Sequence, residues 1–343
     1  MKRDITTVGE VLVDLMQTGV DARGIGCYSA NPGGAPANVA VAAARLGAHT
    51  AFIGKVGRDA FGAMLRKTLA DNAVDVTGLT ETEKAHTTLA VVSVDSRGER
   101  NFSFYRDPGA DTQLECGDVG DSLLGETRFL HFGSLSLTTE PARSATLYAA
   151  RRAKALGALV SYDPNYRAPL WPDEASAMHW MRVPLGMPEG PDERMHQQTG
   201  TGTRAVLSLV DVLKISDEEL ALMTDTDVLE DGAQRLVEQG VRLVLVTLGA
   251  KGVYYRWGDL SGTVPGFAVT VSDTNGAGDT FFGAVLTKLA QRPEGIDDFD
   301  RDELEAILRF ANKAASLTTS RPGAIPAMPT LDEVEKSLAA EVN

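Results

Sequence analysis

The hydrophobic and polar positions of the chain follow two spacings in turn. Short apolar runs of strand length alternate with longer runs whose apolar residues recur every three to four positions. Strands are predicted at 5–15 (interrupted by Gly9-Glu10), 51–53, 87–94, 101–105, 129–135, 158–163, 210–215, 243–248, 253–255 and 268–271. Helices are predicted at 39–47, 141–156, 281–289 and 306–319. A further helix is predicted after the strand at 51–53 and ends at residue 70, and another begins at Ser216. This alternation is typical of an α/β protein with a mostly parallel sheet between helices.

Two segments depart from the alternation of strands and helices. The strands at 87–94 and 101–105 are separated by Asp95-Ser96-Arg97-Gly98, which predicts a β-hairpin. Residues 184–204 are rich in Pro, Gly and Thr and have no usable periodicity, so they are interpreted as a loop insertion. This insertion is either a surface loop or part of an oligomer contact.

Composition and charge limit the class of protein. The 343 residues suffice for one large α/β domain, and 43% hydrophobic with 23% charged residues is ordinary for a globular chain. A net charge of -14 argues against nucleic acid or an anionic membrane surface as a partner. Cys27 and Cys116 lie far apart without metal-ligand spacing, and no apolar run approaches the roughly 18 residues that span a bilayer. Because the first strand follows Met1 almost at once, a cytoplasmic protein is expected.

The most informative stretch is Ser272-Asp273-Thr274-Asn275-Gly276-Ala277-Gly278-Asp279-Thr280, which lies between a strand-like run and an apolar helix. Gly276 and Gly278 allow the backbone to turn tightly and to approach a ligand closely. The first amides of the following helix have no partner within the helix, so they form a site for phosphate. Asp279 could take a proton from an attacking alcohol. The alternative is a plain tight turn with Asp279 as an N-cap.

A second stretch near the N-terminus has similar properties. Gly33-Gly34 exposes backbone amides just before an Ala-rich helix, and Asn38 offers both a donor and an acceptor. Asp14, near the end of the first predicted strand, is either a strand-end cap or an acceptor for a sugar hydroxyl.

Together these stretches resemble the signatures of the ribokinase/PfkB family of carbohydrate kinases. The C-terminal stretch resembles D-T-x-G-A-G-D, and residues 33–62 resemble G-G-x-x-x-N followed by G-x-V-G-x-D-x-x-G. The run D-P-N-x-R at 163–167 is most similar to the fructokinase branch. The resemblance implies a ribokinase-like three-layer α/β/α sandwich that forms a single domain over 1–343. It also implies a small β-sheet lid, made of residues 12–30 and 85–106.

The same resemblance implies an ATP-dependent sugar kinase that makes fructose 6-phosphate from fructose, with Mg²⁺ as a cofactor. Asp279 would be the base, and the amides of Gly276, Ala277 and Gly278 would hold the transferred phosphoryl group with help from Arg167. The residues implied to bind the sugar are Asp14, Gly33, Gly34, Asn38, Tyr105 and Arg106.

Further residues are implied for the nucleotide and for a monovalent cation (K⁺). The nucleotide set is Asn165, Lys214, Glu219, Thr247, Gly249, Gly252 and Asn312. The cation set is Asp273, Asn275, Thr318, Arg321 and Gly323. The family commonly has N-x-x-E where this chain has Ser216 to Glu219, so only Glu219 matches, and the pair also fits a helix capping box.

Three other functions remain open from the sequence. A kinase for 2-keto-3-deoxygluconate or a related keto acid would use Tyr105-Arg106 to meet a carboxylate. A catalytically silent sugar- or nucleotide-binding member and a nucleoside kinase are the others. Neither a Walker motif nor a protein-kinase H-R-D motif occurs. A homodimer is expected.

Overall fold

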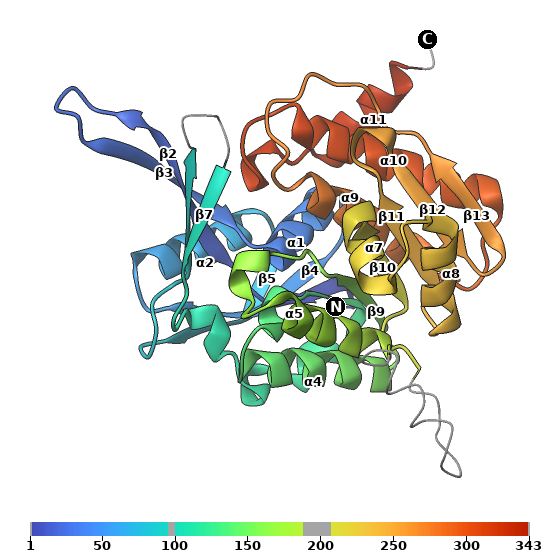
Figure 1. Cartoon of the computed structure of the whole chain (residues 1–343), viewed down its shortest axis with the longest axis horizontal. Coiled ribbons are helices and arrows are strands. Elements are labelled where there is room, and N and C mark those ends of the chain that lie inside the picture. The colour runs from blue at the N-terminus through green and yellow to red at the C-terminus, as the bar shows by residue number, and fades with distance from the viewer. Residues whose placement is uncertain (1, 95–99, 188–206, 342–343) are drawn as a thin grey trace.

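A nine-stranded sheet forms the centre of the molecule in the computed structural model, which describes residues 2–94, 100–187 and 207–341. The strand order is β13-β12-β11-β10-β9-β8-β1-β4-β5, and the neighbours from β5 to β11 are all parallel (Figure 1). β12 and β13 extend the sheet antiparallel at one edge. The strands are β1 (Arg3–Val8), β4 (Thr50–Gly57), β5 (Val74–Thr82), β8 (Thr127–Gly133), β9 (Leu159–Asp163), β10 (Val212–Ser216), β11 (Leu243–Thr247), β12 (Val253–Trp257) and β13 (Leu260–Val264).

Helices cover both faces of this sheet. Because parallel strands are buried on both sides, their sequences are nearly continuous apolar runs. One face packs against α3 (Asp121–Leu124), α4 (Ala142–Ala155), α5 (Glu174–Arg182), α7 (Asp217–Thr224) and α8 (Leu229–Glu238). The other packs against α1 (Ala35–Arg45), α2 (Ala60–Asp71), α9 (Ala277–Gln291), α10 (Arg301–Thr319) and α11 (Leu331–Ala339). The predicted three-layer α/β/α fold is confirmed.

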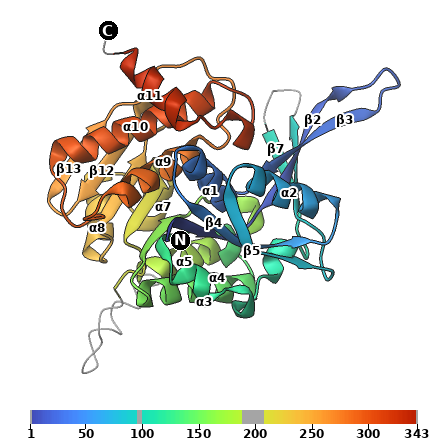
Figure 2. The same cartoon turned by 180° about the vertical axis from the view of Figure 1, so that it is seen from behind.

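A second, four-stranded sheet lies beside the main body. Its order is β3-β2-β6-β7, from β2 (Leu12–Val20), β3 (Gly26–Gly33), β6 (Leu89–Val94) and β7 (Arg100–Tyr105). The hairpin of β2 and β3 projects well beyond the helices in both views (Figures 1 and 2). β2, β6 and β7 fall within the two segments expected to form a lid, 12–30 and 85–106, and β3 continues past the first of them to Gly33.

The strand order places the sheet's reversal point at β1. From β1 the chain goes first to β4 and β5 on one side, then to β8 and onward on the other. In open α/β sheets, ligands bind outside the carboxyl ends of the strands where the order reverses. The segments that follow β1 and β8 are therefore the first place to look for a site.

Several predicted elements differ from those observed. The run 5–15 is two strands in different sheets, because Gly9, at φ 146°, lets the chain leave the main sheet after Val8. Residues 268–271 form no strand, and the helix predicted from Phe281 already begins at Ala277. The hairpin turn Asp95–Gly98 and residues 188–204 of the insertion lie outside the described residues, and 183–185 form a short 3₁₀ helix. No helix of the described chain is long and apolar enough to cross a membrane.

Candidate active site

A cleft of about 530 Å³ lies at the reversal point, between the carboxyl ends of the main strands and the small sheet. Its walls come from segments far apart in the sequence. The lining residues are Glu10, Leu12, Asp14, Gly34, Ala35, Asn38, Ala90, Phe104, Leu135, Asn165, Arg167, Lys214, Thr274, Asn275, Gly276, Gly278 and Asp279. Most residues predicted for the sugar, the base and the phosphoryl group therefore meet in one cavity.

The Gly-rich loop shapes the N-terminus of α9. Gly276 is the N-cap at φ 74°, a left-handed conformation that L residues with a side chain rarely adopt. A Cβ at Gly276 would also lie 3.0 Å from the Cβ of Ala324. The internal hydrogen bonds of α9 start with the Thr280 amide, which donates to Gly276 O at 2.8 Å. The amides before it, at the positive end of the helix dipole, suit an anion that reaches the cleft.

Asp279 lies in the first turn of α9 and is not its N-cap. Its carboxylate Oδ2 accepts a hydrogen bond from Asn38 Nδ2 of α1 at 2.8 Å. Burial raises the pKa of Asp279, while the Asn38 hydrogen bond and the cations Lys214 and Arg167 oppose the rise. A buried carboxylate whose pKa is moved upward is suited to accept a proton near neutral pH.

A buried lysine lies beneath the Gly-rich loop. Lys214, on β10, donates to Asp163 Oδ2 at the end of β9 at 2.8 Å, and both side chains are buried. An ideal Cβ at Gly278 would be 3.1 Å from Lys214 Nζ, so the ammonium group lies against the loop backbone. Burial lowers the pKa of Lys214, but Asp163, Glu219 and Asp279 together raise it above its ordinary value. Lys214 therefore stays charged in the cleft.

Glu219 has both carboxylate oxygens engaged by protein groups. Oε2 accepts from the amide and hydroxyl of Ser216, which is the predicted capping box, and that box is confirmed. Oε1 accepts from the Tyr166 amide at 2.6 Å. This second bond holds the loop after β9, where Asn165 adopts a left-handed conformation at φ 46° and lines the cleft together with Arg167. A metal or water contact of Glu219 stays a prediction.

The segment that follows β1 contributes two acidic groups to the cleft, Glu10 and Asp14. Burial raises the pKa of Asp14 to about 6, with Arg167 opposing and Asp279 and Asp273 adding to the rise. Asp14 lies against Gly33, where an added Cβ would be 2.5 Å from Oδ2. Glu10, which sequence reasoning missed, accepts from the Ala35 amide at 3.1 Å, and burial raises its pKa to about 8. The only available signal for Glu10 was a charged residue inside an otherwise apolar run.

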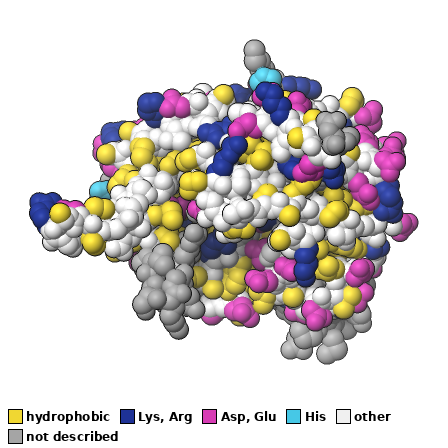
Figure 3. Space-filling model, turned by 90° about the horizontal axis from the view of Figure 1, so that it is seen from above, with side chains coloured by type: hydrophobic (Ala, Val, Ile, Leu, Met, Phe, Trp, Pro, Cys, Tyr) yellow, Lys and Arg dark blue, Asp and Glu magenta, His cyan; other side chains and the backbone are white. Residues whose placement is uncertain are grey.

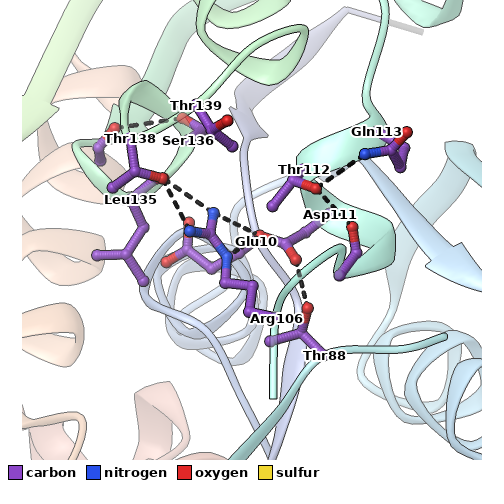
Figure 4. Close-up of polar contacts among 12 residues, drawn as sticks. Glu10, Thr88, Arg106, Asp111, Thr112, Gln113, Leu135, Ser136, Thr138 and Thr139 are labelled. Atoms are coloured by element: carbon purple, nitrogen blue, oxygen red, sulfur yellow. Dashed lines mark hydrogen bonds and ion pairs between the residues drawn. The ribbon is translucent and has the colours of Figure 1, made fainter. Parts of the chain in front are cut away.

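Tyr105 and Arg106 do not line the cleft. Tyr105 is 66% exposed and faces a separate hollow on the other side of the small sheet. The Arg106 guanidinium is buried and bonded to Asp111, Leu135 O and Thr138 Oγ1 (Figure 4). The expected role of this pair at the sugar is not supported by their positions, because the guanidinium is already occupied by protein groups.

The residues predicted for the nucleotide lie along the adjoining strand ends. Thr247 ends β11 and donates to Ile215 O, and Gly249 and Gly252 turn the chain into β12 with φ 57° and 102°. Asn312, on α10, is buried and donates to Val264 O and Pro265 O. Gly252 packs against Val264 and Pro265, the residues that Asn312 holds, so Asn312 lies close to the Gly249–Gly252 turn. A nucleotide contact of these residues stays a prediction.

The residues predicted for the cation are joined by Asp273. Its Oδ1 accepts from the Asn275 amide at 3.0 Å and its Oδ2 from the Gly323 amide at 3.2 Å. Thr318 is buried and donates to Thr280 Oγ1, whereas the Arg321 side chain turns away to Glu333. Asp273 therefore joins the Gly-rich loop to the turn at Gly323, and a cation contact of these residues stays a prediction.

Within the described ranges, no group of three or more His, Cys, Asp and Glu side chains could hold a metal ion. Mg²⁺ usually keeps several waters and binds through one or two carboxylates plus substrate phosphates. Asp163 and Glu219 are close enough to Lys214 to act on its charge, but neither lines the cleft. Their oxygens accept hydrogen bonds from Lys214, Asn165, Ser216 and Tyr166, so a contact with Mg²⁺ stays a prediction.

Comparisons with known proteins agree on one family. A family model described as pfkB family carbohydrate kinase matches residues 2–184 and 191–331. Fructokinase-1 of Oryza sativa subsp. japonica is 40% identical over 335 residues, covering 97% of this chain and 96% of the rice protein.

Solved structures give the same result. The fructokinase from Xylella fastidiosa with bound ATP matches with a TM-score of 0.85 at 34% identity, covering 99% of this chain and 100% of that one. A double mutant of the Vibrio cholerae O395 fructokinase, with fructose, ADP and potassium ion bound, matches with a TM-score of 0.81 at 33% identity. That match covers 98% of this chain and 99% of the other.

Proposed function

Since the chain belongs to the pfkB family of carbohydrate kinases, we propose that it transfers the γ-phosphoryl group of ATP to fructose and makes fructose 6-phosphate. The observation that carries the proposal is the arrangement around Asp279. A buried carboxylate with a raised pKa lies in one cavity with the amides of a helix N-terminus and with the carboxyl group of Asp14. A base, an anion site and a hydroxyl acceptor are the groups that phosphoryl transfer to an alcohol requires.

The chemical step follows from these positions. The sugar hydroxyl gives its proton to Asp279 as its oxygen attacks the γ-phosphorus, and the bond to the bridging oxygen of ADP breaks. The amides of Gly276, Ala277 and Gly278 stabilise the charge on the transferred group, and Lys214 and Arg167 add positive charge beside it. Asp14, Gly34 and Asn38 orient the sugar so that its hydroxyl is in line. Mg²⁺ bound with ATP would neutralise phosphate charge near Asp163 and Glu219.

The structure offers no observation in favour of a keto acid as substrate. That alternative depended on Tyr105 and Arg106 meeting a carboxylate, yet Tyr105 lies outside the cleft and Arg106 is occupied by Asp111. An intact base and anion site also speak against a silent member of the family.

Three further properties belong to the proposal: a bound K⁺, a homodimer and a reducing compartment. K⁺ beside Asp273 would hold the loop that carries Gly276. A homodimer would pair the projecting small sheets, because Val20, Ile25 and Tyr28 on β2, β3 and their turn are more than half exposed. Figure 3 shows hydrophobic side chains along that projection. Cys27 and Cys116 are free thiols, which suits a reducing compartment such as the cytoplasm.

A coupled ADP-release assay tests the function. Mg-ATP is supplied with fructose, 2-keto-3-deoxygluconate, ribose or adenosine, and turnover with fructose is expected to dominate. Asp279→Ala should lower kcat by about 100-fold or more, the range for loss of a general base, with an unchanged circular dichroism spectrum. Asp173→Asn, at the N-cap of α5 away from the cleft, is the control. Near-normal kcat in the Asp279 variant would show that another group is the base.

A further inference from the structure

Asp111 joins both ends of the β6–β7 hairpin to the body of the protein. Thr88, just before β6, donates to Asp111 Oδ1 at 2.5 Å. Arg106, just after β7, donates from Nε to Asp111 Oδ2 at 2.8 Å and pairs with the same oxygen through Nη2 (Figure 4). The side chains of Arg106 and Asp111 are 7% and 2% exposed. One buried carboxylate therefore holds the point where the hairpin leaves the body and the point where it returns.

Gly109 allows this close approach. A Cβ at Gly109 would lie 2.0 Å from Thr88 Oγ1 and 2.9 Å from both Arg106 Cγ and Asp111 Oδ1. The Ala110 amide, next to it, donates to His86 O at 2.8 Å, which ties the incoming strand to the same turn. The backbone at Gly109 thus leaves room for the side chains of Thr88, Arg106 and Asp111 to meet. We call these three residues the Asp111 clamp.

The clamp also reaches the opposite wall of the cleft. Arg106 Nη1 donates to Thr138 Oγ1 at 2.8 Å, and Nη2 donates to Leu135 O at 2.9 Å. Leu135 and Thr138 follow β8 of the main sheet, and Leu135 lines the cleft. The guanidinium therefore connects the small sheet directly with a wall residue of the main body.

The hairpin held by the clamp supplies the apolar wall that faces Leu135. Ala90 of β6 and Phe104 of β7 are cross-strand partners, and both line the cleft. Each lies two residues from a clamp residue, Thr88 or Arg106. A shift of the hairpin ends would therefore move Ala90 and Phe104 relative to Leu135 and change the width of the cleft.

We propose that the Asp111 clamp is a positioning device for the sugar, which sets the distance between the Ala90–Phe104 wall and Leu135 without touching the substrate. The inference rests on the proposed sugar kinase function, and it replaces direct contact by Arg106 with an indirect role. Asp279 and the Gly-rich loop lie outside the clamp, so the clamp should act on sugar binding rather than on the transfer step.

The first test compares Asp111→Asn and Thr88→Val with the wild type in steady-state kinetics and in fructose titration calorimetry. We expect KM and Kd for fructose to rise about 10- to 100-fold, the range for a small misplacement of a substrate, with kcat within a few-fold. Arg182→Met is the matched control, because Arg182 is also a largely buried arginine bonded to a carbonyl and an aspartate, Asp225. A fall in kcat of about 10- to 100-fold with an unchanged KM for fructose would overturn the inference.

The second measurement does not depend on which sugar is bound. Hydrogen exchange of peptides covering β6 and β7 should be faster in both clamp variants than in the wild type, with β8 and β9 unchanged. Unchanged exchange in β6 and β7 would overturn the inference even if fructose proved to be the substrate. Conversely, faster exchange with no fructose turnover in the wild type would sustain the clamp and reject fructose.

Arg106→Met separates the clamp from direct substrate contact. If Arg106 acts only through the clamp, its effect on KM should match that of Asp111→Asn, and the double variant should be no worse than either. A much larger effect of Arg106→Met, with normal exchange in β6 and β7, would assign Arg106 to the substrate and overturn the proposal.

Discussion

The hydrogen bond from Asn38 to Asp279 leads to a quantitative prediction about the base. Asn38→Ala removes a buried 2.8 Å bond to the carboxylate. That bond favours the charged form of Asp279, whereas burial disfavours the charged form. Hydrogen bonds to charged groups contribute about 1.5–3 kcal/mol, and one pKa unit corresponds to about 1.4 kcal/mol. The pKa of Asp279 in the variant should therefore be higher than in the wild type, because the charged form loses a bond of about 1.5–3 kcal/mol.

The pH dependence of kcat/KM measures this change, since it reports the pKa values of the free enzyme. Asp279 must be ionised to act as a base, so the acidic limb of the profile should move to higher pH in Asn38→Ala. Asn38→Asp should move it further, because a second carboxylate would stand at hydrogen-bond distance. Asn72→Ala is a suitable control, since the Asn72 side-chain amide bonds to Arg45 at the end of α1 and to Thr68 of α2, and Asn72 does not line the cleft.

The pH at which the acidic limb of kcat/KM falls, rather than the maximum value of kcat/KM, shows whether Asn38 lowers the pKa of Asp279. A limb that overlays the wild type, with kcat/KM lowered equally at every pH, would refute the reasoning. In that case Asn38 would act only on the sugar, and its bond to Asp279 would not affect the base.

Other predictions concern stability, assembly and ions. Folding raises the pKa of Glu10 from 4.5 to about 8, so the folded state binds the extra proton and stability falls as pH rises through that window. In urea unfolding, the free energy of unfolding of Glu10→Gln should equal that of the wild type near pH 4.5 and exceed it by at most about 5 kcal/mol above pH 8. If the free energies of unfolding of the two proteins depend on pH in the same way, this prediction is wrong. Ile25→Asp should convert a dimer to monomers in analytical ultracentrifugation, whereas an unchanged mass would exclude pairing through this hairpin. Replacing K⁺ by Na⁺ should lower kcat in the wild type and have little further effect in Asp273→Asn, and equal rates in both salts would remove K⁺ from the proposal.

The layers of the fold were predictable because burial on both faces makes parallel strands visible as apolar runs. The break at Gly9 was not, since Val8 and Leu12 are both buried although they belong to different sheets. The run at 268–271 has strand-forming residues, yet no strand among the described residues pairs with it, and Val271 is 61% exposed. Residues that favour the strand conformation form a strand only where a neighbouring strand pairs with them.

The site was predictable from the sequence where the backbone conformation favours glycine. Gly276 and Gly34 adopt positive φ beside the cleft, and such positions produce a pattern of glycines that a sequence displays. The family resemblance implies that Arg106 meets the sugar, and the sequence around Arg106 does not reveal that its guanidinium bonds to Asp111 and Leu135 O. Glu10 was missed for the same reason, since the burial of a charge depends on partners that come together only in the fold.

The bond between Asn38 and Asp279 also has a consequence for biosynthesis. Its two residues are 241 positions apart, and α1 and α9 meet so closely that a Cβ at Gly283 would be 3.0 Å from the Ala42 Cβ. The segment proposed to bind the sugar, which includes Asp14 and Asn38, leaves the ribosome long before α9, which carries the proposed base. Because contacts of such long range form late in folding, recovery of activity in a refolding experiment should report the docking of α9 on α1 rather than formation of the sheet. The enzyme thus becomes active only when the first and last parts of its chain have joined.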